Sequence, residues 1–97
     1  MNVRQILWLP EIEEKLLLKH AVLVEEVEEV LFAQPHIYFV ENGSREGENV
    51  YAATGQTEAG RHLIIFFILK PHAQALILSA RDMDQKERKR YGRRKSQ

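Results

Sequence analysis

Residues 61–69 read Arg-His-Leu-Ile-Ile-Phe-Phe-Ile-Leu, and the stretch from Leu63 to Leu69 is the longest apolar run of the chain. A short apolar run between turn residues is typical of a buried strand. It is far shorter than the ~20 apolar residues that a helix needs to span a bilayer. We therefore predict a strand over 61–69 and no membrane-spanning segment.

The segments on either side of this strand extend it into a sheet. Residues 57–60 and 70–72 contain glycine or proline and are typical of turns, while residues 49–56 and about 74–79 have the composition of strands. Strands joined by short turns pair in antiparallel fashion. We therefore predict an antiparallel meander in which 61–69 is the central strand.

The first half of the chain is predicted to add two helices. A short strand over residues 3–8 precedes a helix over roughly 11–19, and a second helix over roughly 23–33 carries apolar residues at helical spacing. No Ser, Thr, Asp or Asn offers an N-cap for the second helix. A short strand at 36–40 and a polar loop at 41–48 complete this half.

The C-terminal end is predicted to be a third helix. Asp84 followed three residues later by Glu87 is a capping-box pattern, and the helix would run to about residue 94. We predict that residues 92–97 form a frayed basic tail.

Together these elements predict a single α+β domain over residues 1–97. A small antiparallel sheet packs against two N-terminal helices and a C-terminal helix, in the order β-α-α-β-β-β-α, with the helices covering one face.

The composition excludes several kinds of protein. The 97 residues include no cysteine, which excludes disulfide scaffolds, thiolate nucleophiles and cysteine-ligated metals. The N-terminus lacks a basic head followed by an apolar core, so we expect no signal peptide and a small cytoplasmic protein. The four histidines have no metal-ligand spacing, and no phosphate-binding loop or nucleophile elbow is present. We therefore expect neither a metal site nor a cofactor.

The charges are distributed unevenly along the chain. The 14 basic and 14 acidic residues cancel, but residues 81–97 hold eight basic and three acidic residues, a balance of +5, which leaves −5 for the first 80. Such asymmetry suggests contact with a polyanion. A solvated charged helix face is an equally good interpretation of the basic segment.

The available side chains suit RNA cleavage without a metal ion. In that reaction the 2′-hydroxyl of the substrate attacks the adjacent phosphodiester, so the enzyme supplies only a base, an acid and cations. Histidine suits the proton transfers, and arginine binds two phosphate oxygens at once. Each candidate also has a structural alternative, such as a helix-end cation for Lys19 and His20 or a salt bridge for Arg81.

Three groups of residues resemble the BrnT family of type II toxins. Lys19-His20-Ala21-Val22 ahead of a glutamate-rich helix is similar to the family's Lys-His-Gly-Val connector. Gly55-Gln56-Thr57 with Gly60-Arg61 precedes the apolar strand. Ser79-Ala80-Arg81 is followed by Glu87-Arg88 and Tyr91. The resemblance extends from about Trp8 to Arg94.

This resemblance implies a RelE-like fold and a metal-independent endoribonuclease that inhibits translation. It also implies neutralisation by a cognate antitoxin in a hetero-oligomer of two plus two chains, which contacts operator DNA only through the antitoxin complex. In this interpretation Arg61 and Arg81 bind the scissile phosphate, and Lys19 and His20 transfer protons or stabilise charge. The other catalytic candidates are Glu48 and Tyr51. The RNA-binding candidates are Arg45, Lys86, Arg88, Arg90, Tyr91, Arg93 and Arg94.

The chain departs from the family pattern at three positions. Val50 replaces the usual arginine before Tyr51, Ala21 replaces a glycine, and Leu23 stands where a helix cap is expected. Arg45 is close enough in sequence to substitute for the missing arginine. Two alternatives stay open: a catalytically degenerate toxin-like protein that binds antitoxin or nucleic acid, and a nucleic-acid-binding protein unrelated to toxins.

Overall fold

Five strands form one mixed sheet in the computed structural model, which describes residues 1–95. None of the helices in this part of the chain is long and apolar enough to cross a membrane. The elements in chain order are β1 (Gln5–Leu7), α1 (Pro10–His20), α2 (Val24–Phe32), β2 (His36–Glu41), β3 (Val50–Gln56), β4 (His62–Lys70), a 3-10 turn (Pro71–Ala73), β5 (Gln74–Asp82) and α3 (Gln85–Lys95).

The strand order in the sheet is β1-β5-β4-β3-β2, so the apolar strand β4 is central, as predicted. Two features of the predicted topology are corrected. Four strands follow α2, at the positions predicted for four strands, so the order β-α-α-β-β-β-α omits one of them. The sheet is also not wholly antiparallel, because β1 pairs in parallel with β5 through Gln5 and Gln74. This pairing joins residues some 70 positions apart, and no local pattern encodes it.

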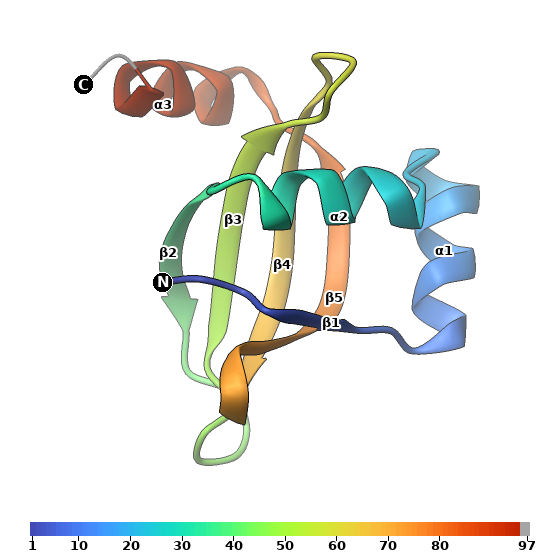
Figure 1. Ribbon diagram of the computed structural model, residues 1–97, viewed down its shortest axis with the longest axis vertical. Coiled ribbons are helices and arrows are strands. Elements are labelled where there is room, and N and C mark those ends of the chain that lie inside the picture. The colour runs from blue at the N-terminus through green and yellow to red at the C-terminus, as the bar shows by residue number, and fades with distance from the viewer. Residues whose placement is uncertain (96–97) are drawn as a thin grey trace.

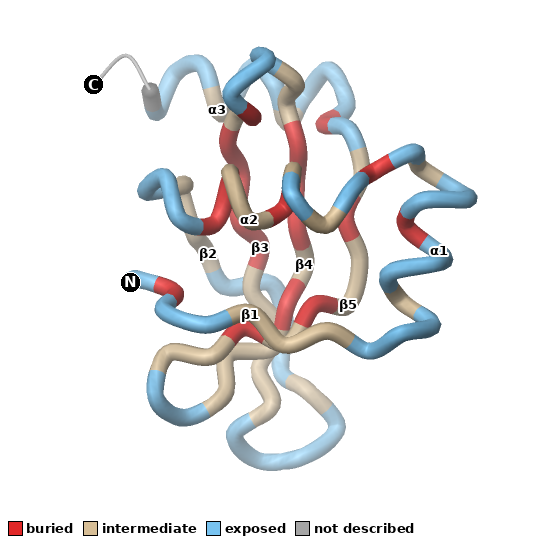
Figure 2. The backbone as a smooth tube through the Cα atoms, turned by 45° about the vertical axis from the view of Figure 1, so that its right-hand side comes forward, coloured by how far each residue is buried: buried red, intermediate tan, exposed pale blue. Residues whose placement is uncertain are grey.

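The side chains of β4 alternate between two apolar clusters. Leu63, Ile65 and Phe67 pack in the larger cluster with residues of α1 and α2, whereas Ile64 and Phe66 belong to a second cluster with residues of β3 and α3. In Figure 1, α2 crosses in front of the strands and α3 lies at the upper end of the sheet. Figure 2 shows that the buried segments concentrate in the middle of the sheet. The expectation that all helices cover one face was wrong, because α3 packs on the other face.

A bulge in β5 decides the direction of the residues that follow it. Phe67 pairs with Ile77 but Phe66 pairs with Ser79, so Leu78 is an extra residue. A bulge of this kind shifts the alternation of side chains. Ala80 therefore enters the core, and Arg81 lies on the face that carries α3. The strand continues to Asp82 rather than ending near residue 79.

Helix α3 begins with the predicted capping box. The Glu87 N–H donates to Asp84 Oδ1 and the Asp84 N–H donates to Glu87 Oε1, both at 2.8 Å. The helix runs to Lys95, so residues 92–95 are helical rather than a frayed tail. The remainder of that expectation, residues 96–97, lies outside the described residues.

Helix α1 ends in a left-handed turn. Pro10 occupies the first turn, where its missing N–H is not needed, and Ala21 closes the helix with φ of 52°. The Ala21 N–H donates to Leu17 O and the Val22 N–H to Leu16 O. The left-handed region costs a residue with a Cβ roughly 1–2 kcal/mol, whereas glycine adopts it freely.

We predict that Ala21→Gly raises the free energy of unfolding by about 0.5–1 kcal/mol, because it relieves this strain. Ala33→Gly is the matched control, since Ala33 also ends a helix but has φ of −106°. It should lower stability, because glycine adds freedom to the unfolded chain with no strain to relieve. Urea denaturation of both variants measures the effect, and equal shifts in the two would contradict the conformational explanation.

Candidate functional site

Arg61 joins three elements through a single guanidinium group. Its Nε and Nη2 donate to Oδ1 and Oδ2 of Asp82 at 2.7 and 3.2 Å, at the end of β5. Nη1 donates to Ala21 O at 2.7 Å and to Glu26 Oε1 at 3.0 Å, and Nη2 also donates to His20 O at 2.9 Å. All five N–H groups of the guanidinium are therefore used, and they hold the α1–α2 connector against the sheet.

The same contacts shift the ionisation of both partners. The hydrogen bond from Arg61 holds the pKa of Asp82 below its ordinary value, and Asp82 raises the pKa of Arg61. Glu26 also accepts the Leu23 N–H at 3.0 Å, which supplies the start of α2 with a cap that the sequence lacks at Leu23 itself. Arg61 thus acts in the free protein as a bridge between charged and backbone groups.

Arg81 lies on the opposite face, one residue before Asp82. Its Nη1 and Nη2 donate to the two carboxylate oxygens of Glu87 at 2.7 and 2.9 Å, and Nη1 also donates to Asp82 O at 3.1 Å. Its guanidinium carbon is 5.7 Å from the centre of the Phe66 ring. The paired groups lower the pKa of Glu87 and raise that of Arg81, mainly through this hydrogen bonding.

Aromatic and cationic side chains surround Arg81 on this face. The guanidinium of Arg90 lies 4.4 Å from the centre of the Tyr38 ring, and the rings of His62 and Tyr91 meet edge to face at 5.8 Å. A hollow of about 620 Å³ opens beside the start of α3 and is lined by His62, Met83, Gln85, Arg88 and Lys89. The surface therefore combines ring faces for stacking with cations for phosphate contact.

His36 lies on the same face beneath the end of α3. Burial and the nearby charges of Arg94 and Arg90 lower its pKa, which favours the neutral imidazole. Its Nε2 is buried and has no hydrogen-bond partner among the described residues. The ring centres of His36 and Tyr38 are 5.6 Å apart.

The structure brings only some of the predicted site residues together. Lys19 and His20 end α1 beside Arg61, and the charge of His20 contributes to the lowered pKa of Asp82. Asp82 therefore has His20 and Arg61 on one side and Arg81 on the other. The RNA-binding candidates Lys86, Arg88, Arg90, Tyr91, Arg93 and Arg94 all belong to α3.

Glu48, Tyr51 and Arg45 lie at the other end of the sheet. Tyr51 pairs with Phe67 and stacks on its ring, and it meets the ring of Phe39 edge to face. Glu48 Oε1 is 3.7 Å from Lys70 Nζ. Arg81 pairs with Ile64, which pairs with Thr54, so Tyr51 and Val50 are about 10 and 13 Å along β3 from the row of Arg81, at ~3.3 Å per residue. Tyr51 also packs against the larger cluster, on the face of the sheet opposite Arg81.

Four residues of the α3 face were not among the predicted site residues: His36, Tyr38, His62 and Phe66. The alternation of β4 gives a signal for two of them, because His62 and Phe66 share a face with Ile64. No sequence pattern places His36 and Tyr38 under α3, because that contact depends on how the helix docks. Within residues 1–95, no group of three or more His, Cys, Asp or Glu side chains is arranged to hold a metal ion.

The comparison with protein families defines the class of protein. A family model described as the ribonuclease toxin BrnT of type II toxin–antitoxin systems matches residues 8–87. The chain belongs to this family, and membership implies a cognate antitoxin as partner. A comparison with curated proteins finds no match. The left-handed φ of Ala21 gives a physical reason for the glycine that the family pattern has at this position.

We predict that Arg61→Lys lowers the free energy of unfolding at pH 7 by about 1–3 kcal/mol, because one ammonium cannot bridge Asp82, Glu26 and two carbonyls. Arg4→Lys is the matched control at an exposed arginine and should change stability by less than about 0.5 kcal/mol. Urea denaturation measures both.

The pH dependence gives a second readout of the same variant. The pKa of Asp82 is lower in the folded protein than in the unfolded chain, where it is ~3.9. The ion pair with Arg61 therefore contributes fully to the free energy of unfolding above pH ~3.9, and this contribution is lost as the pH falls through the pKa of the folded protein. The stability difference between wild type and Arg61→Lys should therefore shrink in acid below about pH 4. A difference that stays constant down to pH 2 would contradict the role of this ion pair.

Proposed function

We propose that this chain is a metal-independent endoribonuclease that cleaves RNA, inhibits translation and is neutralised by its cognate antitoxin. The observation that carries the proposal is the position of Arg81, among ring faces and the cations of α3, in a chain of the BrnT family. The RelE-like fold, the two-plus-two complex and the contact with operator DNA through the antitoxin belong to the same proposal.

Arg81 is the proposed phosphate ligand. Its planar fork suits two phosphate oxygens, and in the free protein Glu87 occupies the fork with two carboxylate oxygens in the same geometry. An RNA phosphate would exchange with this carboxylate. Glu87 would still have a hydrogen-bond partner after this exchange, because it also accepts the Asp84 N–H at the start of α3.

Lys19 and His20 are the proposed groups for proton transfer and charge stabilisation, from the opposite side of Asp82. The 2′-hydroxyl attacks the phosphorus, its proton passes to a base, and an acid protonates the departing 5′-oxygen. Arg61 takes the role of a positioning residue rather than a phosphate ligand, since its five N–H groups already hold the backbone of His20 and Ala21 and the two carboxylates.

The RNA strand would run across the α3 face. Its bases stack on Tyr38, Phe66 and Tyr91, and its phosphates contact the basic side chains of α3. We assign no part in this step to Glu48, Tyr51 and Arg45, because Tyr51 stacks on Phe67 on the other face of the sheet and Arg45 and Glu48 belong to the loop before β3.

A second candidate function is a toxin-like protein that binds antitoxin or nucleic acid without cleavage. The specific observation in its favour is that both Arg61 and Arg81 are already paired with carboxylates. Val50, in place of the family's usual arginine, also removes one cation.

We predict that the purified chain cuts RNA in the presence of EDTA and leaves 2′,3′-cyclic phosphate or 3′-phosphate ends. Arg81→Ala should slow cleavage about 10- to 100-fold, because a charge-assisted contact to the phosphate is lost. Arg4→Ala is the matched control and should cut at the wild-type rate. Gel analysis of fragments and of their ends measures the outcome.

Two results would decide against this proposal. Intact RNA after incubation with folded wild-type protein that binds its antitoxin would establish the second candidate. Wild-type cleavage rates in Arg81→Ala would remove Arg81 from the site.

A further inference from the structure

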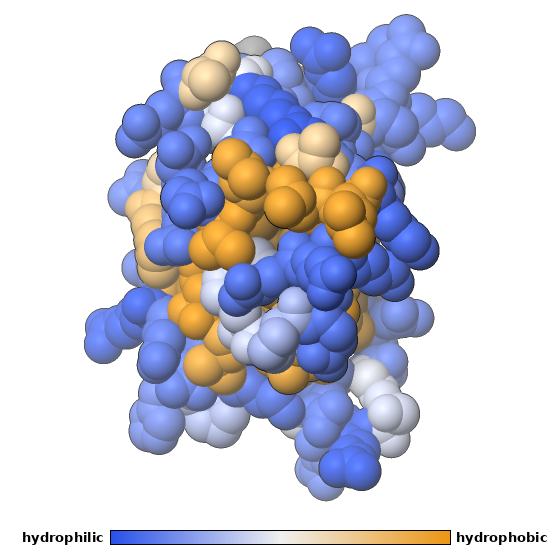
Figure 3. Space-filling model, turned by 90° about the vertical axis from the view of Figure 1, so that its right-hand side faces the viewer, coloured by the Kyte–Doolittle hydropathy of each residue, from blue (hydrophilic) through white to orange (hydrophobic). Residues whose placement is uncertain are grey.

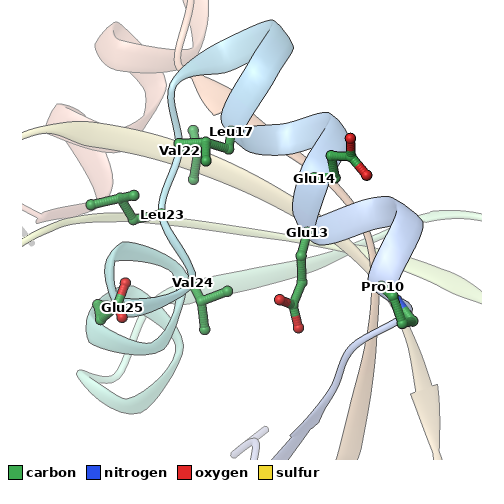
Figure 4. Close-up of a pocket in the computed structure, with 8 residues that line it drawn as sticks. All are labelled: Pro10, Glu13, Glu14, Leu17, Val22, Leu23, Val24 and Glu25. Atoms are coloured by element: carbon green, nitrogen blue, oxygen red, sulfur yellow. The ribbon is translucent and has the colours of Figure 1, made fainter.

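A groove of about 450 Å³ separates α1 from the start of α2. Pro10, Glu13, Glu14 and Leu17 line it from α1, and Val22, Leu23, Val24 and Glu25 line it from the connector and α2. Figure 4 shows Glu13 and Val24 directed toward one another across the gap, with Leu17 and Val22 close together at its upper end.

Large apolar side chains are exposed in and beside this groove. Leu17 and Leu23 are each 49% exposed, and the neighbouring Leu18 is 74% exposed. Figure 3 shows hydrophobic side chains gathered on this side of the molecule and surrounded by hydrophilic ones. A contiguous apolar patch with a polar rim marks an interaction surface more often than scattered exposed residues do.

The rim of the groove carries one sign of charge. Glu13, Glu14 and Glu25 all line it, and the lining includes no basic side chain. Charge complementarity therefore favours an occupant with lysine or arginine beside its apolar residues, and it disfavours RNA.

The floor of the groove is held in place before any partner arrives. Arg61 binds the backbone carbonyls of His20 and Ala21, and Ala21 leads directly into Val22 and Leu23. A preordered surface loses less entropy when it binds. The groove also lies on the helix side of the sheet, away from Arg81.

We propose that this groove docks a basic amphipathic helix of the cognate antitoxin. Its leucine-sized side chains would pack on Leu17, Leu23 and Val24, and its cations would pair with the three glutamates. A groove between helices offers no unpaired strand edge, so a helix laid in the groove is the binding mode that fits. The identity of the partner rests on the toxin–antitoxin function proposed above.

The first test measures the affinity of the chain for its cognate antitoxin by calorimetry. Leu17→Ala combined with Leu23→Ala should weaken binding at least 10-fold. Phe32→Ala is the matched control, because Phe32 is 52% exposed at the far end of α2. This variant should bind the antitoxin with wild-type affinity. Circular dichroism verifies that each variant is folded.

The second test separates charge from apolar contact. The triple variant Glu13→Lys, Glu14→Lys and Glu25→Lys should weaken binding about 10-fold or more. The control, Glu41→Lys, Glu46→Lys and Glu58→Lys, makes the same change of net charge at exposed positions outside the groove and should have a smaller effect.

The possible outcomes separate this inference from the proposed function. Wild-type affinity in the double alanine variant, or no antitoxin binding by wild type, would overturn the docking site whether or not RNA is cut. A wild-type dimer that the alanine variant dissociates, with antitoxin affinity unchanged, would assign the groove to a second copy and overturn the inference. If the wild-type chain cuts no RNA but binds the antitoxin, and the double alanine variant loses that binding, the docking site is supported and the ribonuclease proposal fails.

Discussion

The rest of the structure depends on the guanidinium group of Arg61. This group contacts the end of α1, the connector that follows it, the start of α2 and the end of β5 at once. Two carboxylates and two carbonyls converge there, and without the cation the carboxylates would repel one another and the carbonyls would lose charge-assisted hydrogen bonds. Solvent reduces this cost at Asp82, whose side chain is 64% exposed. The left-handed turn at Ala21 is tolerated because its carbonyl gains a charge-assisted hydrogen bond in that conformation.

Local signals predicted the parts of the fold that depend on local interactions. The apolar run from Leu63 to Leu69 forms the central strand, and Asp84 with Glu87 forms the capping box of α3. The parallel pairing of β1 and the docking of α3 on the second face were not predicted, because both join segments distant in the sequence.

The bulge at Leu78 shows why the site was harder to predict than the fold. Strict alternation from the core residue Ile77 would place Arg81 inside the core, whereas the extra residue turns it to the α3 face. Register likewise decides that Tyr51 faces Phe67 at the far end of the sheet. The family resemblance suggested both as site residues, and neither the bulge nor the register has a sequence signature here.

The distribution of charge in space gives the two faces of the sheet opposite electrostatic character. Helices α1 and α2 hold most of the glutamates, and α3 holds seven of the basic residues. The net charge of zero therefore consists of an excess of negative charge on one face of the sheet and of positive charge on the other. At physiological ionic strength the Debye length is ~8 Å, and the sheet with its two side-chain layers is thicker than this. Each face therefore presents its own charge to solution with little cancellation from the other. A polyanion is drawn to the α3 face and repelled from the groove, and a basic peptide experiences the opposite. The RNA site and the antitoxin-docking groove that we propose would therefore lie on oppositely charged faces of a single sheet.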